Sequence, residues 1–195
     1  MMTMEQLRPL FEKALGDAGV LVIRAAATDL GRPTPCADWD LRALIGHMIG
    51  QNAGFAAAVR DGDAPPSAYA APELGAGEIR PRWEESADRL RTAFREADPE
   101  RVLRLAEFDR EVTATTALGM QVLDCAVHAW DVAKALDEDY RPPPEVAETV
   151  LASARMIAAR PGGTPGVFAA PVETGSTEAG DSADPWREAL RLLGR

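Results

Sequence analysis

The sequence predicts an all-α fold, a bundle of four main helices with short additional helices and a loop-rich C-terminal tail. Several segments place apolar residues at three- and four-residue intervals, and helix-capping residues precede them. The chain has no internal repeat. A length of 195 residues suits one domain. We therefore expect residues 1–195 to form a single domain, with a core over about residues 3–160 and the tail, 161–195, packed on it.

The N-terminal third of the chain predicts two helices separated by a rigid connection. Thr3-Met4-Glu5-Gln6 forms a capping box, and the helical pattern continues to about Thr28. Two prolines within Gly31–Cys36 exclude regular helix there. Asp40 can then cap a second helix that ends at Asp61-Gly62-Asp63. The stripe that recurs at three- and four-residue intervals along this helix is apolar apart from Asn52 and consists of Leu41, Leu44, Ile45, Met48, Asn52, Phe55 and Val59.

The middle of the chain predicts a loop, a third helix, an irregular connection and a buried fourth helix. Ala64–Pro81 is rich in proline, glycine and alanine, which favours a long surface loop. Pro81 can begin the third helix, and Asp98-Pro99 stops it. Val102–Thr113 mixes alternating and helical signals, so we expect an irregular or partly extended connection. Ala114–Leu136 is nearly apolar all round, which indicates a central, buried helix.

The last third of the chain predicts two further helices. The first follows the break at Pro142–Pro144 and ends before Pro161-Gly162-Gly163. The tail after it is mostly loop. At the end of the tail, Asp184 as a cap, Pro185 at the first helical position and Gly194 as a stop predict a short helix.

Composition narrows the classes of partner. A net charge of -10 without a basic run argues against nucleic acid or anionic membrane, so small molecules become the expected partners. No apolar stretch is a convincing membrane span. Glu5 and Glu12 stand where a secretory signal needs an uninterrupted apolar segment, so we expect a cytoplasmic protein. Cys36 and Cys125 are too few for a disulfide framework and are expected to be free thiols.

One group of polar residues on the predicted helices could bind a metal ion. Asp124 and His128 lie four residues apart on the buried helix, so their side chains project from the same face. The chain has one other histidine, His47, beside the apolar stripe of the second helix. Two neighbouring helices could bring all three together around a divalent metal, with zinc as the first choice and nickel as the second. Three protein ligands leave positions for water or substrate, as in catalytic sites.

Other interpretations of these residues stay open at this point. The Asp124/His128 spacing also suits a hydrogen-bonded core pair or a surface pair. Asp131 could accept the second ring N–H of a ligating histidine, or it could bond elsewhere. We expect the remaining polar and aromatic candidates, Trp39, Asn52, Trp130, Cys36 and Cys125, to be core or thiol residues rather than ligands. No nucleophile motif or phosphate-binding glycine loop is present.

Two blocks of sequence resemble a known family. The first is Pro33-Thr34-Pro35-Cys36-Ala37-Asp38-Trp39-Asp40-Leu41 with Leu44 and His47, and the second is Asp124-Cys125-Ala126-Val127-His128-Ala129-Trp130-Asp131-Val132-Ala133. Together they resemble the actinobacterial metal-binding proteins related to the mycothiol-dependent maleylpyruvate isomerase N-terminal domain and to the wider DinB-like group. Two stretches of the tail, Phe168–Val172 and Leu192–Arg195, extend the resemblance over nearly the whole chain.

The resemblance implies a DinB-like four-helix bundle with a divalent metal at its mouth, bound by His47, Asp124 and His128. The isomerase itself carries Glu where this chain has Asp124, and the shorter carboxylate could reset the position of the metal. Several relatives bind a low-molecular-weight thiol at the metal and transfer or add it to an electrophile. We therefore expect a metal-dependent thiol transferase or isomerase that uses mycothiol and a small electrophilic metabolite.

Two rival functions follow from the same residues. The bundle could be a non-catalytic, metal-dependent binding or stress-response module, or a structural bundle whose buried polar residues only fix the packing. A transferase should supply cations for substrate carboxylates, and Arg82, Arg89 and Arg104 are the candidates, although no motif singles one out. The sequence leaves a homodimer open.

Overall fold

A computed structural model describes residues 2–36, 38–75, 77–159, 170–172 and 184–195 of the chain. The chain divides into two compact units, Met1–Tyr140 and Arg141–Arg195. Helices dominate both units, which confirms the all-α prediction, and one small sheet lies in the first unit.

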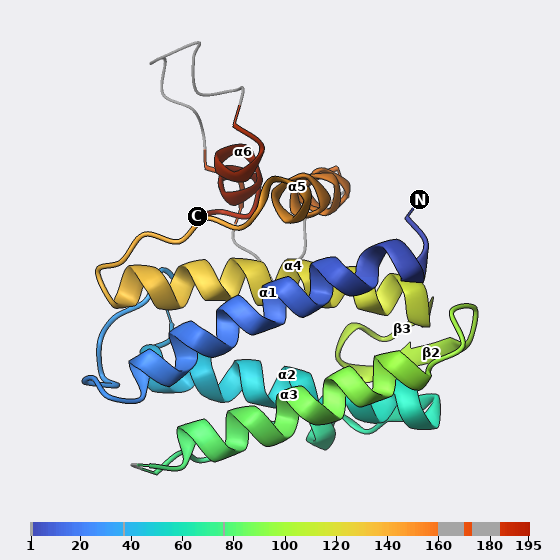
Figure 1. Ribbon diagram of the computed structural model, residues 1–195, viewed down its shortest axis with the longest axis horizontal. Coiled ribbons are helices and arrows are strands. Elements are labelled where there is room, and N and C mark those ends of the chain that lie inside the picture. Colours follow the sequence, from blue (N-terminus) through green and yellow to red (C-terminus); the bar gives the residue numbers. More distant parts are fainter. Residues whose placement is uncertain (1, 37, 76, 160–169, 173–183) are drawn as a thin grey trace. The chain divides into compact units, whose positions relative to one another are not determined.

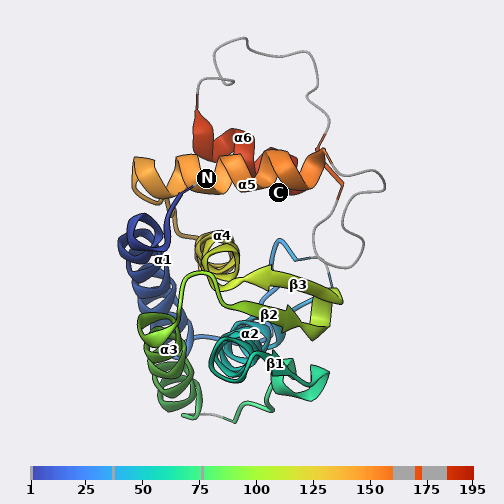
Figure 2. The ribbon, with the colours of Figure 1, turned by 90° about the vertical axis from the view of Figure 1, so that its right-hand side faces the viewer.

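The first unit is a bundle of four helices. Their bounds are α1 Met4–Ala25, α2 Leu41–Asp61, α3 Ile79–Glu96 and α4 Ala114–Ala135. The end-on view of Figure 2 places them at four corners, with α1 beside α4 and α3, and α2 beside α3 and α4. Along the chain, α1 and α4 run in one direction and α2 and α3 in the other (Figure 1). The helices that carry the two histidines, α2 and α4, are therefore antiparallel neighbours.

Local capping signals set the ends of these helices. Thr3 forms the predicted capping box of α1, and the Asp40 side chain accepts from the Ala43 N–H at 2.8 Å to begin α2. Gly62 ends α2 in the left-handed region, with φ at 90°, a conformation that favours glycine. The Thr113 side chain caps α4 by accepting from the Thr116 N–H at 3.2 Å. Helix α3 begins at Ile79, two residues before the predicted start.

The interior of the bundle is apolar, and α4 is buried along most of its length, as predicted. Burying a leucine or phenylalanine side chain stabilises a fold by about 1.5–3 kcal/mol, and residues such as Phe11, Phe55 and Leu118 lie fully inside. The buried polar exceptions on α4 include Gln121, His128 and Asp131. Because an unpaired polar group in such a core is costly, the partners of these side chains decide what they do.

A three-stranded sheet connects the end of α2 to the start of α4. Its strands are β1 Asp63–Ala64, β2 Val102–Leu105 and β3 Arg110–Thr113, in the order β1-β2-β3. Strand β1 pairs with β2 in parallel, and β2 pairs with β3 antiparallel. The short 3-10 helix η2, Ala106–Phe108, joins β2 to β3. The expected partly extended connection over residues 102–113 is therefore a hairpin.

The segment between α2 and α3 is more closely packed than a surface loop. It contains the 3-10 helix η1, Pro66–Tyr69, and Tyr69 and Leu74 are both buried. The ring of Tyr69 lies so close to α2 that a Cβ atom at Gly54 would lie 2.2 Å from it. A Cβ atom at Gly50 would lie 2.5 Å from the Tyr69 carbonyl oxygen. These two glycines therefore allow η1 to pack against α2.

The second unit contains α5, Pro144–Ala158, and α6, Pro185–Leu192. Asp184 caps α6 as predicted, and Pro185 takes the first helical position. Arg155 on α5 forms two hydrogen bonds of 3.0 Å with the Glu188 carboxylate on α6. The predicted stop at residues 161–163 and the Phe168 end of the tail stretch lie outside the described residues.

Among the described residues, no helix is both long enough and apolar enough to span a membrane.

Candidate metal centre

The structure brings His47, Asp124 and His128 together. His47 lies about two turns after the start of α2, and His128 about two turns before the end of α4, so the antiparallel pairing puts them at the same level. Asp124 lies one turn before His128 on the same face. One donor atom from each residue lies within 4.8 Å of the other two. The helical spacing and the neighbouring helices thus produce the arrangement that the sequence predicts.

The separations between these side chains suit donors that share an ion. The Asp124 Oδ1 atom lies 3.5 Å from the His128 Nε2 atom, and the rings of His47 and His128 meet edge to face with centroids 5.1 Å apart. Donors at about 2.1 Å from a tetrahedral zinc ion lie roughly 3.4 Å apart. A direct N–H···O hydrogen bond is typically about 2.7–3.2 Å long. The spacing is therefore closer to that of two ligands than to that of a hydrogen-bonded pair.

Access to the centre differs among the three residues. The Asp124 side chain is 23% exposed, whereas the His128 side chain is 7% exposed and His47 is half-buried. Solvent therefore reaches the centre from the Asp124 side. Imidazole nitrogens and a carboxylate oxygen form a donor set that suits zinc and other first-row divalent metals.

The two histidines experience opposite electrostatic environments. Burial lowers the pKa of His47 to about 4, although the Asp124 carboxylate opposes this effect, so the ring is neutral at pH 7 and keeps a free lone pair. Burial also disfavours a charged His128, but the carboxylates of Asp124 and Asp131 outweigh it and raise the pKa of His128 to about 10. In the protein without an ion, the positive charge of protonated His128 thus balances the negative charges of Asp124 and Asp131.

Asp131 and Cys36 lie on the other side of the His128 ring. Asp131 is fully buried, and its Oδ2 atom lies 3.0 Å from His128 Nδ1. The Cys36 thiol donates to the same Oδ2 atom at 3.2 Å. The sequence left the role of Asp131 open and gave no reason to connect it with Cys36. Both cysteines are free thiols, as predicted.

The three other aromatic and amide candidates differ in whether they contact the centre. The indole of Trp39 lies against the His47 ring, with centroids 4.5 Å apart, so Trp39 contacts the centre although we expected a core residue. Asn52 is a core residue, as expected, and its amide donates to the Ser86 hydroxyl at 3.2 Å. Trp130 is half-buried under the Lys134 ammonium group, 5.7 Å from the ring centroid.

Glu107, for which no pattern in the sequence predicts a role, lies on η2 near the centre. The buried Gln51 amide donates to the Glu107 carboxylate at 2.8 Å, and Gln51 follows His47 by one turn of α2. Partial burial raises the pKa of Glu107, the Gln51 hydrogen bond opposes this effect, and the negative charge of Asp124 adds to it. Glu107 lies in the segment whose structure the sequence did not determine, so no signal pointed to it.

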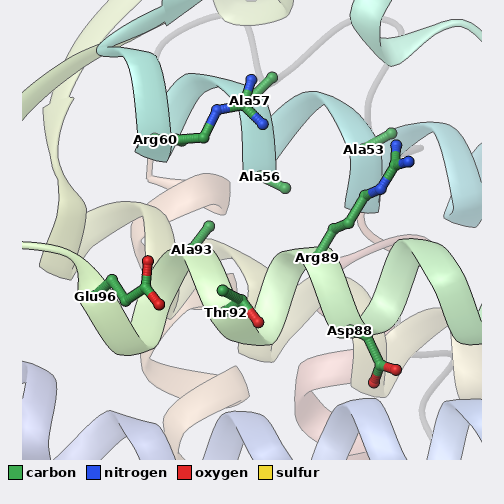
Figure 3. A pocket seen from close by; sticks show the side chains of 9 residues that line it. All are labelled: Ala53, Ala56, Ala57, Arg60, Asp88, Arg89, Thr92, Ala93 and Glu96. Carbon is green, nitrogen blue, oxygen red and sulfur yellow. The ribbon is translucent and has the colours of Figure 1, made fainter.

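The three arginines proposed for substrate carboxylates form ion pairs elsewhere. Arg82 pairs with Glu78, Arg89 with Glu85, and Arg104 with Asp109. Figure 3 shows Arg89 beside a cavity of about 410 Å³ that residues of α2 and α3 line. From the helical spacing, the lining residues of α2 lie on the side of that helix away from His47. Within the described part of the chain, no arginine or lysine forms an ion pair with Asp124 or Glu107.

A second hollow, of about 530 Å³, lies at the start of α2. It is lined by Asp40, Arg42, Ala43 and Gly46 on one side and by residues 71–74 on the other. Ala43 precedes His47 by one turn, so this hollow borders the helix that carries His47 without containing a donor of the candidate centre.

Comparisons with known proteins agree on one family. Two uncharacterized proteins of Mycobacterium tuberculosis, from the strains CDC 1551 / Oshkosh and H37Rv, are each 28% identical over 149 residues, which cover 75% of this chain and 76% of theirs. Crystal structures of the mycothiol-dependent maleylpyruvate isomerase and of its histidine-to-alanine mutant match the fold. Their TM-scores are 0.59 and 0.60 at 20% and 18% identity, over 79% of this chain and 72% of theirs.

The family described as the mycothiol maleylpyruvate isomerase N-terminal domain matches residues 13–133. This region is more than half of the chain and contains His47, Asp124 and His128. The chain therefore belongs to the family of the mycothiol maleylpyruvate isomerase N-terminal domain.

Proposed function

We propose that the protein binds one divalent metal ion through His47, Asp124 and His128 and uses it in a mycothiol-dependent transferase or isomerase reaction on a small electrophilic metabolite. Zinc is the first choice of ion and nickel the second, because both accept imidazole and carboxylate ligands. The observation that carries the proposal is the convergence of three donor atoms within 4.8 Å at a place that solvent can reach.

The family supplies the second line of support. The solved relatives are described as mycothiol-dependent, and the three donors of this chain lie within the region that the family covers. A bound divalent ion would act as a Lewis acid that lowers the pKa of a coordinated thiol or water. A reducing cytoplasm, which we propose as the location, supplies low-molecular-weight thiols and keeps Cys36 and Cys125 reduced.

Each residue near the ion has a separate task in this proposal. The two imidazoles and the Asp124 carboxylate hold the ion, and the half-buried Trp39 covers the His47 ring and excludes water from that side. Glu107 is an acid–base group close enough to feel the charge of Asp124 and does not coordinate the ion, and Gln51 fixes its orientation. Glu107 could therefore accept the proton that an incoming thiol loses.

A second candidate function is a non-catalytic, metal-dependent binding module. The position of the arginines favours it, because Arg82, Arg89 and Arg104 form ion pairs away from the centre. Within the described residues, no arginine or lysine forms an ion pair with Asp124 or Glu107. A transferase for a dicarboxylate substrate would need a cation there, whereas a module that binds a neutral ligand would not.

The test begins with elemental analysis of protein expressed without a metal-binding tag. We expect about one equivalent of ion in the wild type and less than about one-tenth in His47→Ala. Asn52→Ala is the matched control, because it disturbs a buried residue of the same helix without touching a donor. Calorimetry with mycothiol and thiol consumption with a panel of electrophiles then follow on the metal-loaded protein.

The outcomes separate the functions. Metal binding with mycothiol binding and thiol consumption supports the transferase or isomerase. Metal binding without either would leave the binding module, and a wild-type protein that holds no more ion than His47→Ala would reject both functions in favour of a structural bundle.

A further inference from the structure

One turn of the chain contacts both histidines of the candidate centre. Trp39 stacks on His47, and Cys36 hydrogen-bonds to Asp131, which in turn bonds to His128. The turn precedes α2, whereas Asp131 and His128 lie on α4, so these contacts connect the two helices.

The turn is held in shape by its own hydrogen bonds. The Thr34 hydroxyl donates to the Trp39 carbonyl oxygen at 2.8 Å and accepts from the Cys36 N–H at 3.1 Å. The Trp39 N–H donates to the Cys36 carbonyl oxygen at 2.8 Å, and a β-bridge joins Pro33 to Asp40. The two prolines of the segment further restrict the backbone. These bonds hold Cys36 beside Trp39, and the hydrogen bond from Cys36 to Asp131 connects it to α4.

Asp131 is the most deeply buried charged group near the centre. Its side chain has no exposed surface, and a buried carboxylate is costly unless hydrogen bonds compensate it. The Oδ2 atom receives two such bonds, one from His128 Nδ1 at 3.0 Å and one from the Cys36 thiol at 3.2 Å. The carboxylate therefore holds the Nδ1 side of the ring, and Nε2 faces Asp124.

We propose that Cys36 and Asp131 are positioning residues that orient His128, so that its Nε2 atom faces the ion. This inference rests on the proposed metal centre of His47, Asp124 and His128. Asp131 fixes which ring nitrogen keeps its hydrogen, and Cys36 holds Asp131 in place by donating to the same Oδ2 atom that His128 contacts. The turn that carries Cys36 also presents Trp39 to His47, so a single segment of backbone sets the orientation of both imidazoles.

The same residues allow a different assignment. Donor atoms of Cys36, His128 and Asp131 also lie within 4.8 Å of one another, so this cluster could bind an ion of its own. Such an ion would take the Nδ1 atom of His128 away from Asp131. The stoichiometry of binding separates the two assignments, because positioning residues add no second equivalent.

The experiment measures the affinity of the whole chain for zinc by competition with a chromophoric chelator. We expect Asp131→Asn to weaken binding by about 10- to 100-fold, the range found when a partner of a ligating histidine is lost. Cys36→Ala should weaken it by roughly two- to fivefold, because a thiol is a weak donor. Cys36→Ser should restore most of this loss, since its hydroxyl also donates.

Cys125→Ala is the matched control for Cys36→Ala. Cys125 is fully buried and adjacent to Asp124 in the sequence, but its side chain points about 100° away around the helix. Its replacement should lower the melting temperature of the metal-free protein and leave the zinc affinity unchanged. A merely structural role for Cys36 would reproduce that behaviour and overturn the proposal.

Nitrogen-15 NMR of the metal-free protein provides a readout that needs no ion. The proton on His128 Nδ1 should exchange slowly in the wild type and in Cys125→Ala, and rapidly in Asp131→Asn. If this pattern holds while zinc does not bind, the positioning role stands and the proposed function fails. If zinc binds but neither Asp131→Asn nor Cys36→Ala changes its affinity, the positioning role fails alone. Two equivalents of zinc, with one lost in Cys36→Ala, would also overturn it.

Discussion

At the scale of single residues, Asp124 is the carboxylate that, among the described residues, raises the pKa of both His47 and His128. It faces the charged His128 and also stabilises a charge on the otherwise neutral His47. Because the side chain is partly exposed, it can change partners from histidine to an ion without a change in the core. Its length should therefore determine the position of the ion rather than the stability of the fold.

This reasoning predicts the effects of two substitutions of Asp124. Asp124→Ala should reduce bound metal below about one-tenth of an equivalent, because two imidazoles remain as ligands. Asp124→Glu should keep about one equivalent with altered affinity, since the carboxylate is retained. Elemental analysis measures both, and Asp88→Ala, an exposed aspartate on α3, is the matched control. Full metal content in Asp124→Ala would contradict the assignment of this ligand.

The raised pKa of Glu107 predicts a dependence of stability on pH. A raised pKa means that the folded protein favours the protonated form of Glu107. This contribution to the free energy of unfolding is complete below the ordinary glutamate pKa, and it is lost as the pH rises through the higher pKa of the folded state. A glutamine side chain cannot ionise, so the Glu107→Gln variant does not lose this stability. The difference in unfolding free energy between the variant and the wild type should therefore increase in favour of the variant from pH 4 to pH 8.

Urea unfolding of the metal-free protein at several pH values measures this effect. Glu111→Gln, at an exposed position on β3, is the control and should show a smaller change with pH. An advantage of Glu107→Gln that is largest at acidic pH would contradict the prediction.

The sequence could predict some residues of the centre and not others. Helical spacing places Asp124 and His128 on one face of their helix, and His47 is the one other histidine of the sequence. The family resemblance is what made all three the expected ligands of one ion. Cys36 and Glu107 were not predictable, because each lies outside regular helix, where spacing does not determine direction. The contact of Cys36 with Asp131 depends on a turn, and that of Glu107 with Gln51 depends on a strand pairing.

At the scale of elements, glycines on α2 determine how closely η1 packs. Gly54→Ala would place a Cβ atom 2.2 Å from the Tyr69 ring, so we expect a destabilisation of about 1–3 kcal/mol. Gly16→Ala on α1 meets nothing within 4 Å and should stabilise the helix by about 0.5–1 kcal/mol. Chemical denaturation of the two variants measures the contrast. Equal effects would contradict the packing described for η1.

The helices were more predictable than the sheet. Capping residues such as Thr3 and Asp40 are local signals, and the observed helices begin where these residues predict. Strands β2 and β3 are four residues each, and β1 contributes two residues from a distant part of the chain. Such short strands depend on their partners, so the alternation within residues 102–113 was ambiguous until the pairing was known.

At the scale of the whole molecule, metal binding and folding should be coupled. An ion that binds only the folded protein stabilises it by about 2.7 kcal/mol at a free concentration one hundred times the dissociation constant. The melting temperature of the wild type should therefore rise with added zinc and fall with a chelator, whereas that of His47→Ala should change little. A shift of the same size in His47→Ala would locate the binding elsewhere.

The sheet imposes one more condition on the molecule. Strand β1 follows α2 directly and β3 precedes α4 directly, so the pairing β1-β2-β3 fixes the rotation of both helices about their axes. One inserted residue at either junction would turn the attached helix by about 100° and point its histidine elsewhere. Relatives that retain His47, Asp124 and His128 should therefore keep the number of residues around the hairpin constant. Their chain lengths should vary instead between η1 and α3, because an insertion there does not rotate α2 or α4.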